Sequence, residues 1–190
     1  MDTAHLRATV PEGAAKLEGC QILEAYTLEP ALVTTDNHLE VTDTDWFALK
    51  LDCHKFLLFF ASSTDVPVVE GRKFEIIQPS LEVVEGLPFV EKWPKGPAHV
   101  WCRVPEVEEK LAARAILGLK VMATPFQISD EQTGQLLREL RVDSSLVLAL
   151  SGGIGIEVAE GDWPPMTLRV RIGSCEDLLG SVDGSANAQR

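Results

Sequence analysis

The chain of 190 residues carries 29 acidic and 17 basic side chains, a formal net charge of −12, and 45% of its residues are hydrophobic. This length and apolar content are typical of one globular domain or of two small halves packed together, and they exclude a disordered or fibrous chain. So negative a surface also excludes nucleic acid as a partner, because binding to phosphates requires clustered Lys and Arg.

The N-terminal segment, residues 1–16, is expected to be an arm, and it contains no apolar core of signal-peptide length. The longest apolar run, at residues 56–61, is too short to span a bilayer, so no membrane is expected as a partner. These features predict a soluble, cytoplasmic protein.

The four cysteines, Cys20, Cys53, Cys102 and Cys175, stand at wide spacings. In a protein without an export signal, we expect them to be reduced, buried thiols. No pair has the close spacing of a zinc knuckle. The sequence therefore predicts neither a metal ion nor a cofactor.

Short apolar segments separated by polar or Gly/Pro-rich turns are typical of a β-rich protein. In chain order, strands are expected at 20–28, 46–51, 55–61, 73–78, 98–104, 118–124, 144–150, 154–160 and 167–172. Helices are expected at 105–117, which begins with a proline suited to the first turn, and at 129–140, which Ser129 would cap. The small, polar residues 181–190 are expected to be a disordered tail. The predicted class is a β-rich α+β fold with one or two short helices.

No Lys or Arg occurs from Leu17 to Leu49, although this window contains seven acidic residues. The segment 29–45 within it is predicted to present an acidic surface, formed by Glu29, Asp36, Glu40, Asp43 and Asp45. A surface of one charge sign attracts a basic protein and raises its association rate. The plainer alternative is a solvated face without a partner.

Trp93 and Trp163 are each followed by a proline in a predicted loop. Tryptophan is favoured at binding hot spots, so both are candidate anchors for the same basic partner. Alternatively, they cap the ends of the sheet.

The stretch SGGIGIEVAEG, residues 151–161, is either a phosphate-binding loop or a hairpin turn. Glycine adopts positive φ at a tight turn without steric cost. Ile154, Ile156 and Val158 then alternate with a period of two, whereas a phosphate loop needs a helix behind it. We therefore predict a hairpin.

An offset of 99 residues relates Leu49 to Leu148 and Leu51 to Leu150, and it also relates Gly19 to Gly118. It predicts an internal duplication of two similar antiparallel β units, near 17–78 and 116–172. Each unit would comprise a strand, a variable insert, a hairpin and a further strand. The expected divisions are the arm at 1–16, a first half at 17–97, a second half at 98–180 and the tail.

The sequence favours a non-enzymatic, acidic protein-binding module, such as an immunity-type protein that neutralises a basic partner. The first alternative is a small-ligand binder or an enzyme with its site between the two halves, where Asp52, His54, Glu157 and Asp162 would be tested. The second is a structural or assembly protein whose exposed strand edges pair between copies.

Overall fold

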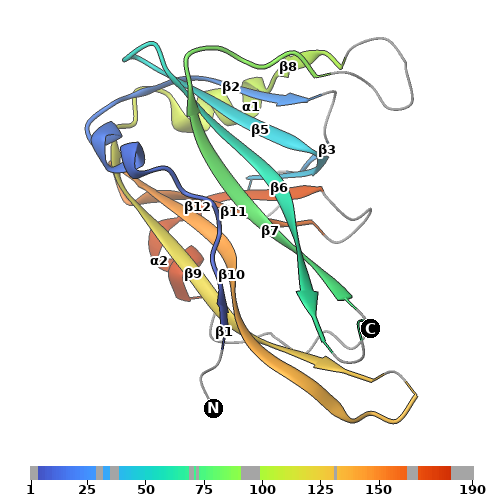
Figure 1. The fold of residues 1–190 in the computed structure, drawn as a ribbon. Coiled ribbons are helices and arrows are strands. Elements are labelled where there is room, and N and C mark those ends of the chain that lie inside the picture. The colour runs from blue at the N-terminus through green and yellow to red at the C-terminus, as the bar shows by residue number, and fades with distance from the viewer. Residues whose placement is uncertain are drawn as a thin grey trace.

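The computed structural model describes residues 4–28, 32–34, 39–68, 71, 73–90, 99–130, 132–161 and 167–180. They form two β-sheets with a few short helices (Figure 1). The predicted β-rich α+β class is confirmed. Within the described part, no helix has the length and apolar character needed to cross a membrane.

The first sheet is antiparallel throughout. Its strands are β2 (Ile22–Leu28), β5 (Trp46–Leu51), β6 (Phe56–Pro67), β7 (Lys73–Val84) and β8 (Trp101–Arg103). They lie in the order β7-β6-β5-β2-β8.

Among the described residues, the second sheet contains seven strands. They are β1 (Ala4–Leu6), β3 (Leu32–Thr34), β4 (Leu39–Thr44), β9 (Ile116–Ser129), β10 (Leu136–Leu150), β11 (Ile154–Glu160) and β12 (Leu168–Ser174). The order is β1-β10-β11-β12-β4-β3, with β9 also paired to β10, and β1 is parallel to β10. The hairpin predicted from the glycine stretch is confirmed as β10–β11, with positive φ at Gly152 and Gly153.

In the described part of the chain, three short helices complete the fold: the 3₁₀ helix η1 (Glu12–Leu17) and the α-helices α1 (Pro105–Leu111) and α2 (Cys175–Gly180). The helix expected at 105–117 ends early, because Ala113 takes a φ of 56° and β9 begins at Ile116. The prediction of a helix at 129–140 is wrong, since β9 ends at Ser129 and β10 begins at Leu136. The Asp130 carboxylate accepts hydrogen bonds from the backbone N–H of Gln132 and Thr133, which closes a turn that leads into β10.

The two sheets share one hydrophobic core. Phe47, Leu49 and Phe59 of the first sheet and Leu148 and Val158 of the second belong to it. A smaller cluster, which includes Val66, Ile76, Ile128, Leu140 and Val142, joins the far ends of the long hairpins β6–β7 and β9–β10. These hairpins extend in the same direction in Figure 1.

Each sheet contains a four-stranded meander in chain order, β2-β5-β6-β7 in the first and β9-β10-β11-β12 in the second. The central hairpins match at the offset of 99: Leu49 pairs with Leu57, and Leu148 with Ile156. Their turns contain a left-handed residue at the same place, His54 with φ 61° and Gly153 with φ 72°.

The first strands of the two meanders match at an offset of 94 instead. Ile22 pairs with Leu51, as Ile116 pairs with Leu150, and in both strands the next residue is skipped in the register. At this offset residues 10–23, VPEGAAKLEGCQIL, share seven of fourteen residues with 104–117, VPEVEEKLAARAIL. The last strands match at an offset of 89, since Leu81 lies opposite Phe59, and Val170 opposite Val158. The offset of 99 therefore applies only to the central hairpin.

The two meanders meet at equivalent residues. Gln21 and Ala115, which correspond at the offset of 94, form a bridge with each other. Ile116 N donates to Cys20 O at 2.9 Å, and Ile22 N donates to Arg114 O at 3.0 Å. Each hydrogen bond is the counterpart of the other, so an approximate twofold axis passes between Gln21 and Ala115. These matches favour an internal duplication, which stays a prediction.

Several elements cross from one half to the other. β3 and β4 come from the insert of the first half but pair with β12 at the edge of the second sheet. β8 follows residue 97 but pairs with β2. Similarly, η1 contacts β9, and α1 contacts β2. The division at residue 97 stays a prediction, and the two sheets do not separate along it.

Candidate functional site

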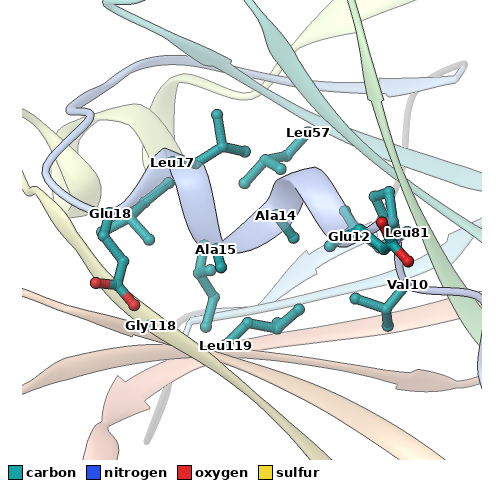
Figure 2. Close-up of a pocket in the computed structure, with 13 residues that line it drawn as sticks. Val10, Glu12, Ala14, Ala15, Leu17, Glu18, Leu57, Leu81, Gly118 and Leu119 are labelled. Atoms are coloured by element: carbon teal, nitrogen blue, oxygen red, sulfur yellow. The ribbon is translucent and has the colours of Figure 1, made fainter.

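A pocket of about 230 Å³ lies beneath η1, between the two sheets (Figure 2). We call it the η1 pocket; it is lined by Val10, Pro11, Glu12, Ala14, Ala15, Leu17, Glu18, Leu57, Leu81, Ile116, Gly118, Leu119 and Leu148. Its floor is apolar and buried, with Leu57 at 1% and Leu148 at 3% exposed. Glu12, Ala15 and Glu18 are exposed at its mouth.

Charge in the η1 pocket is of one sign. Among its described lining residues, only Glu12 and Glu18 are charged. They lie at opposite ends of η1 (Figure 2). The mouth is therefore negative above an apolar floor, an arrangement that favours an apolar group bearing a positive charge.

The local sequence determines the shape of η1. Pro11 precedes its first residue, and Ala14 N donates to Pro11 O at 3.0 Å. Gly19, with a φ of 87°, follows the helix and allows the chain to turn towards β2. The short 3₁₀ helix thus lies across the gap between the sheets.

The second half shows why the η1 pocket is open. At the offset of 94, η1 corresponds to α1, and Gly13, Ala14 and Ala15 stand where α1 has Val107, Glu108 and Glu109. Val107 and Leu111 are fully buried. Glu108 Oε1 accepts a hydrogen bond from Ala25 N at 3.2 Å. Larger side chains fill the space under α1, whereas small ones leave space under η1.

The chain before η1 is held by a buried carboxylate. Asp143 Oδ1 lies 2.6 Å from His5 Nε2, and its Oδ2 accepts a hydrogen bond from Ala8 N at 2.9 Å. Gln78 Nε2 donates to Leu6 O at 3.1 Å, and Leu81 N donates to Thr9 O at 2.9 Å. The segment predicted to be an arm is thus attached to both sheets from residue 4 onward.

Most of the predicted partner-binding residues lie outside the described part of the chain. Glu29, Asp36, Trp93 and Trp163 lie outside the described residues, as does the tail at 181–190, and of Asp43 only the backbone in β4 is described. Glu40 is half-buried in β4, and Asp45 is exposed just after that strand. The acidic surface stays a prediction.

The residues named for a site between the halves do not come together as a group. Glu157 is 4% exposed and accepts a hydrogen bond from Arg171 Nε at 2.8 Å, so it forms an ion pair within the second sheet. Asp52 and His54 lie in the β5–β6 turn of the first sheet, and Asp162 is outside the described residues.

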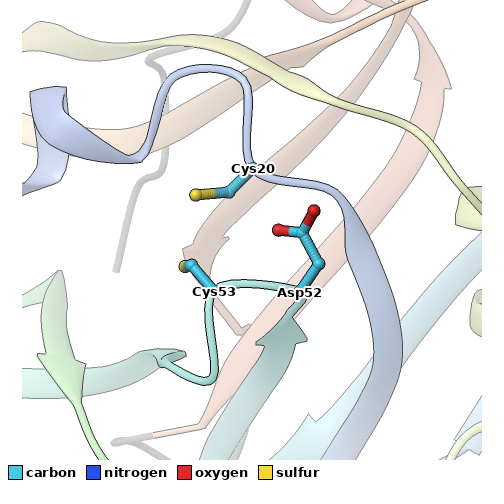
Figure 3. A group of neighbouring side chains, drawn as sticks. All are labelled: Cys20, Asp52 and Cys53. Carbon is cyan, nitrogen blue, oxygen red and sulfur yellow. The ribbon is translucent and has the colours of Figure 1, made fainter.

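Cys20, Asp52 and Cys53 form a cluster that the sequence did not indicate (Figure 3). Their ligand atoms all lie within 4.8 Å of one another. A hydrogen bond with Cys53, aided by loss of solvent and the nearby charges of Cys53 and Asp52, raises the pKa of Cys20 to about 11. All four cysteines are free, as expected, but the expected burial is wrong, since Cys53 is exposed and the others are half-buried.

Comparison with family models, with curated proteins and with solved structures finds no match to this chain.

Proposed function

We propose that this protein is a non-enzymatic binding protein whose η1 pocket accepts a small apolar molecule bearing a positive charge. The observation that carries the proposal is a pocket of about 230 Å³ with a buried leucine floor and a mouth whose only charges, among the described lining residues, are Glu12 and Glu18.

The volume limits the size of the ligand. An engineered apolar cavity of roughly 150 Å³ binds benzene, whereas pockets for drug-sized molecules hold about 300 Å³ or more. A pocket of about 230 Å³ lies between these limits, so it suits a bicyclic ring or a short alkyl chain. At roughly 0.4 kcal/mol for each of about twelve heavy atoms, the dissociation constant is on the order of 0.3 mM.

Naphthylmethylamine, a bicyclic ring with an ammonium group, is the matching probe. It is expected to bind with submillimolar affinity and to shift the methyl resonances of Leu57, Leu119 and Leu148 in an NMR titration. Naphthoate has the same ring with a negative charge and is expected to bind more weakly. Because Glu12 and Glu18 are exposed and screened by solvent, the double variant Glu12→Gln/Glu18→Gln should weaken amine binding only about twofold to fivefold.

Ala14→Leu is expected to weaken binding of the amine by about tenfold or more, because its larger side chain occupies the space that the ring needs. Ala112→Leu is the matched control. It adds the same side chain at an exposed position beside α1, and the amine should bind this variant as it binds the unmodified protein. Equal binding by the Ala14→Leu and Ala112→Leu variants, both folded, would contradict the proposal.

We propose as a second function that the protein is an acidic module that binds a basic protein. It is supported by the net charge of −12 and by the position of β3 and β4, which come from the acidic window and lie at the edge of the second sheet. A strand edge flanked by carboxylates suits a basic partner.

Binding to a basic partner should weaken markedly between about 50 and 500 mM salt, because exposed charges are screened. Lysozyme coupled to a resin provides a basic test surface. The Asp45→Asn variant should elute at lower salt than the unmodified protein. The control Glu109→Gln, on the exposed face of α1, should elute at the same salt concentration as the unmodified protein. Elution of Asp45→Asn together with Glu109→Gln would contradict a role for the acidic window.

A further inference from the structure

Two separate segments of the first half bring the Cys20–Asp52–Cys53 cluster together. Cys20 lies between η1 and β2, whereas Asp52 and Cys53 form the β5–β6 turn. Asp52 N donates to Gln21 O, and Gln21 N donates to Asp52 Oδ1, both at 3.0 Å. This reciprocal pair fixes the turn against the segment that carries Cys20. In Figure 3 the Asp52 carboxylate points towards Cys20.

The distances between the ligand atoms of the cluster suit a metal ion with tetrahedral coordination. Sulfur atoms bound to Zn²⁺ at about 2.3 Å lie about 3.8 Å from each other in that geometry. The ligand atoms of the cluster are already within 4.8 Å, so small side-chain rotations are enough. The hydrogen bond from Gln21 N orients the Asp52 carboxylate, as outer hydrogen bonds commonly orient metal ligands.

The second half contains a fixed positive charge at the corresponding place. By the offsets of 94 and 99, Cys20, Asp52 and Cys53 correspond to Arg114, Ser151 and Gly152. The reciprocal hydrogen bonds between Asp52 and Gln21 have counterparts in the second half. Ser151 N donates to Ala115 O at 2.8 Å, and Ala115 N donates to Ser151 Oγ at 3.0 Å.

The Arg114 guanidinium lies against this turn. Its Nη1 donates to Ser151 O at 2.9 Å and lies 2.2 Å from the position of a Cβ at Gly152. The second half thus places a cationic group beside its turn. The first half has no arginine at the matching position, and it has two thiols and a carboxylate instead.

We propose that Cys20, Cys53 and Asp52 bind Zn²⁺, with water as the fourth ligand. The two thiols lose their protons to solvent as the two Zn–S bonds form, and no oxidation or reduction takes place. A borderline-soft ion is favoured, because thiolates exclude Mg²⁺ and Ca²⁺ while the carboxylate oxygen is also a zinc ligand. The ion would join the segment after η1 to the β5–β6 turn.

Co²⁺ tests the site through its spectrum. The full-length protein is reduced, freed of metal by chelation and titrated with Co²⁺, then with Zn²⁺. We expect saturation at about one ion per chain and an absorption band from thiolate-to-cobalt charge transfer. The visible d–d bands should have the high intensity typical of tetrahedral Co²⁺, and Zn²⁺ should displace the Co²⁺.

Cys53→Ser should weaken Co²⁺ binding by about tenfold or more and reduce the charge-transfer band. Asp52→Asn removes the charge but retains an acceptor for Gln21 N, so the turn should persist while binding weakens by a similar factor. Cys102→Ser and Cys175→Ser are matched controls and should bind Co²⁺ normally. The proposal is overturned if Cys53→Ser binds Co²⁺ as before, if no charge-transfer band forms, or if Cys20 and Cys53 only form a disulfide.

Discussion

Leu111→Ala is expected to lower the free energy of unfolding by about 4 kcal/mol, near the upper end of the range for such substitutions. Leu111 is fully buried and belongs to the shared core, together with the fully buried Val107 of the same helix. Truncation would leave a closed cavity under α1. The cost of a Leu→Ala substitution increases with the cavity that remains, so a site that cannot collapse loses the most.

Leu17→Ala is the matched substitution in the first half and is expected to cost less, about 2 kcal/mol. Leu17 corresponds to Leu111 at the offset of 94, but it lines the η1 pocket beside Ala14 and Ala15. Truncation there widens an existing opening, and η1 is a short 3₁₀ helix that can settle towards the sheets. Urea unfolding of both variants measures the two costs. Equal costs would contradict the difference in packing between η1 and α1.

Glu157→Leu is expected to lower the free energy of unfolding by about 2–3 kcal/mol. Breaking a buried ion pair commonly costs about 3–5 kcal/mol. The cost is reduced here because the Arg171 side chain is 25% exposed and Glu40 lies opposite Arg171 on β4. The loss arises because Arg171 stays partly buried after its ion pair with Glu157 is removed.

The double variant Glu157→Leu/Arg171→Met should recover most of this loss and unfold within about 1 kcal/mol of the unmodified protein, because apolar replacements of a buried pair are often neutral. The single variants Glu157→Leu and Arg171→Met and the double variant are compared by urea unfolding. Additive losses in the double variant would mean that the two side chains do not act as a pair.

Local patterns predicted most of the strands and the β10–β11 hairpin, but they indicated no strand at β1, β3 or β4. Alternating Ile154, Ile156 and Val158 after two glycines can be read without knowledge of the rest of the chain. The helix expected at 129–140 failed because the Asp130 side chain bonds the following backbone and closes a turn. The extended strand β10 then gains its stability from pairing with β9, which no local propensity reports.

The Cys20–Asp52–Cys53 cluster could not be found from spacing. Cys20 and Cys53 are separated by the whole of β2 to β5, and they meet only because the segment after η1 pairs with the β5–β6 turn. The η1 pocket was hidden for another reason, since it arises from small side chains. Alignment of Gly13 and Ala14 with Val107 and Glu108 is the signal that would have indicated it, and the offset of 99 did not bring these residues together.

A crystal structure of the protein with naphthylmethylamine tests most directly whether the first half retains an open binding site where the second half is filled. The ring is expected beneath η1 between Leu57 and Leu148, with its ammonium group beside Glu12 or Glu18. An amine bound elsewhere, or an η1 that closes on the sheets and leaves no space for the ring, would contradict this assignment.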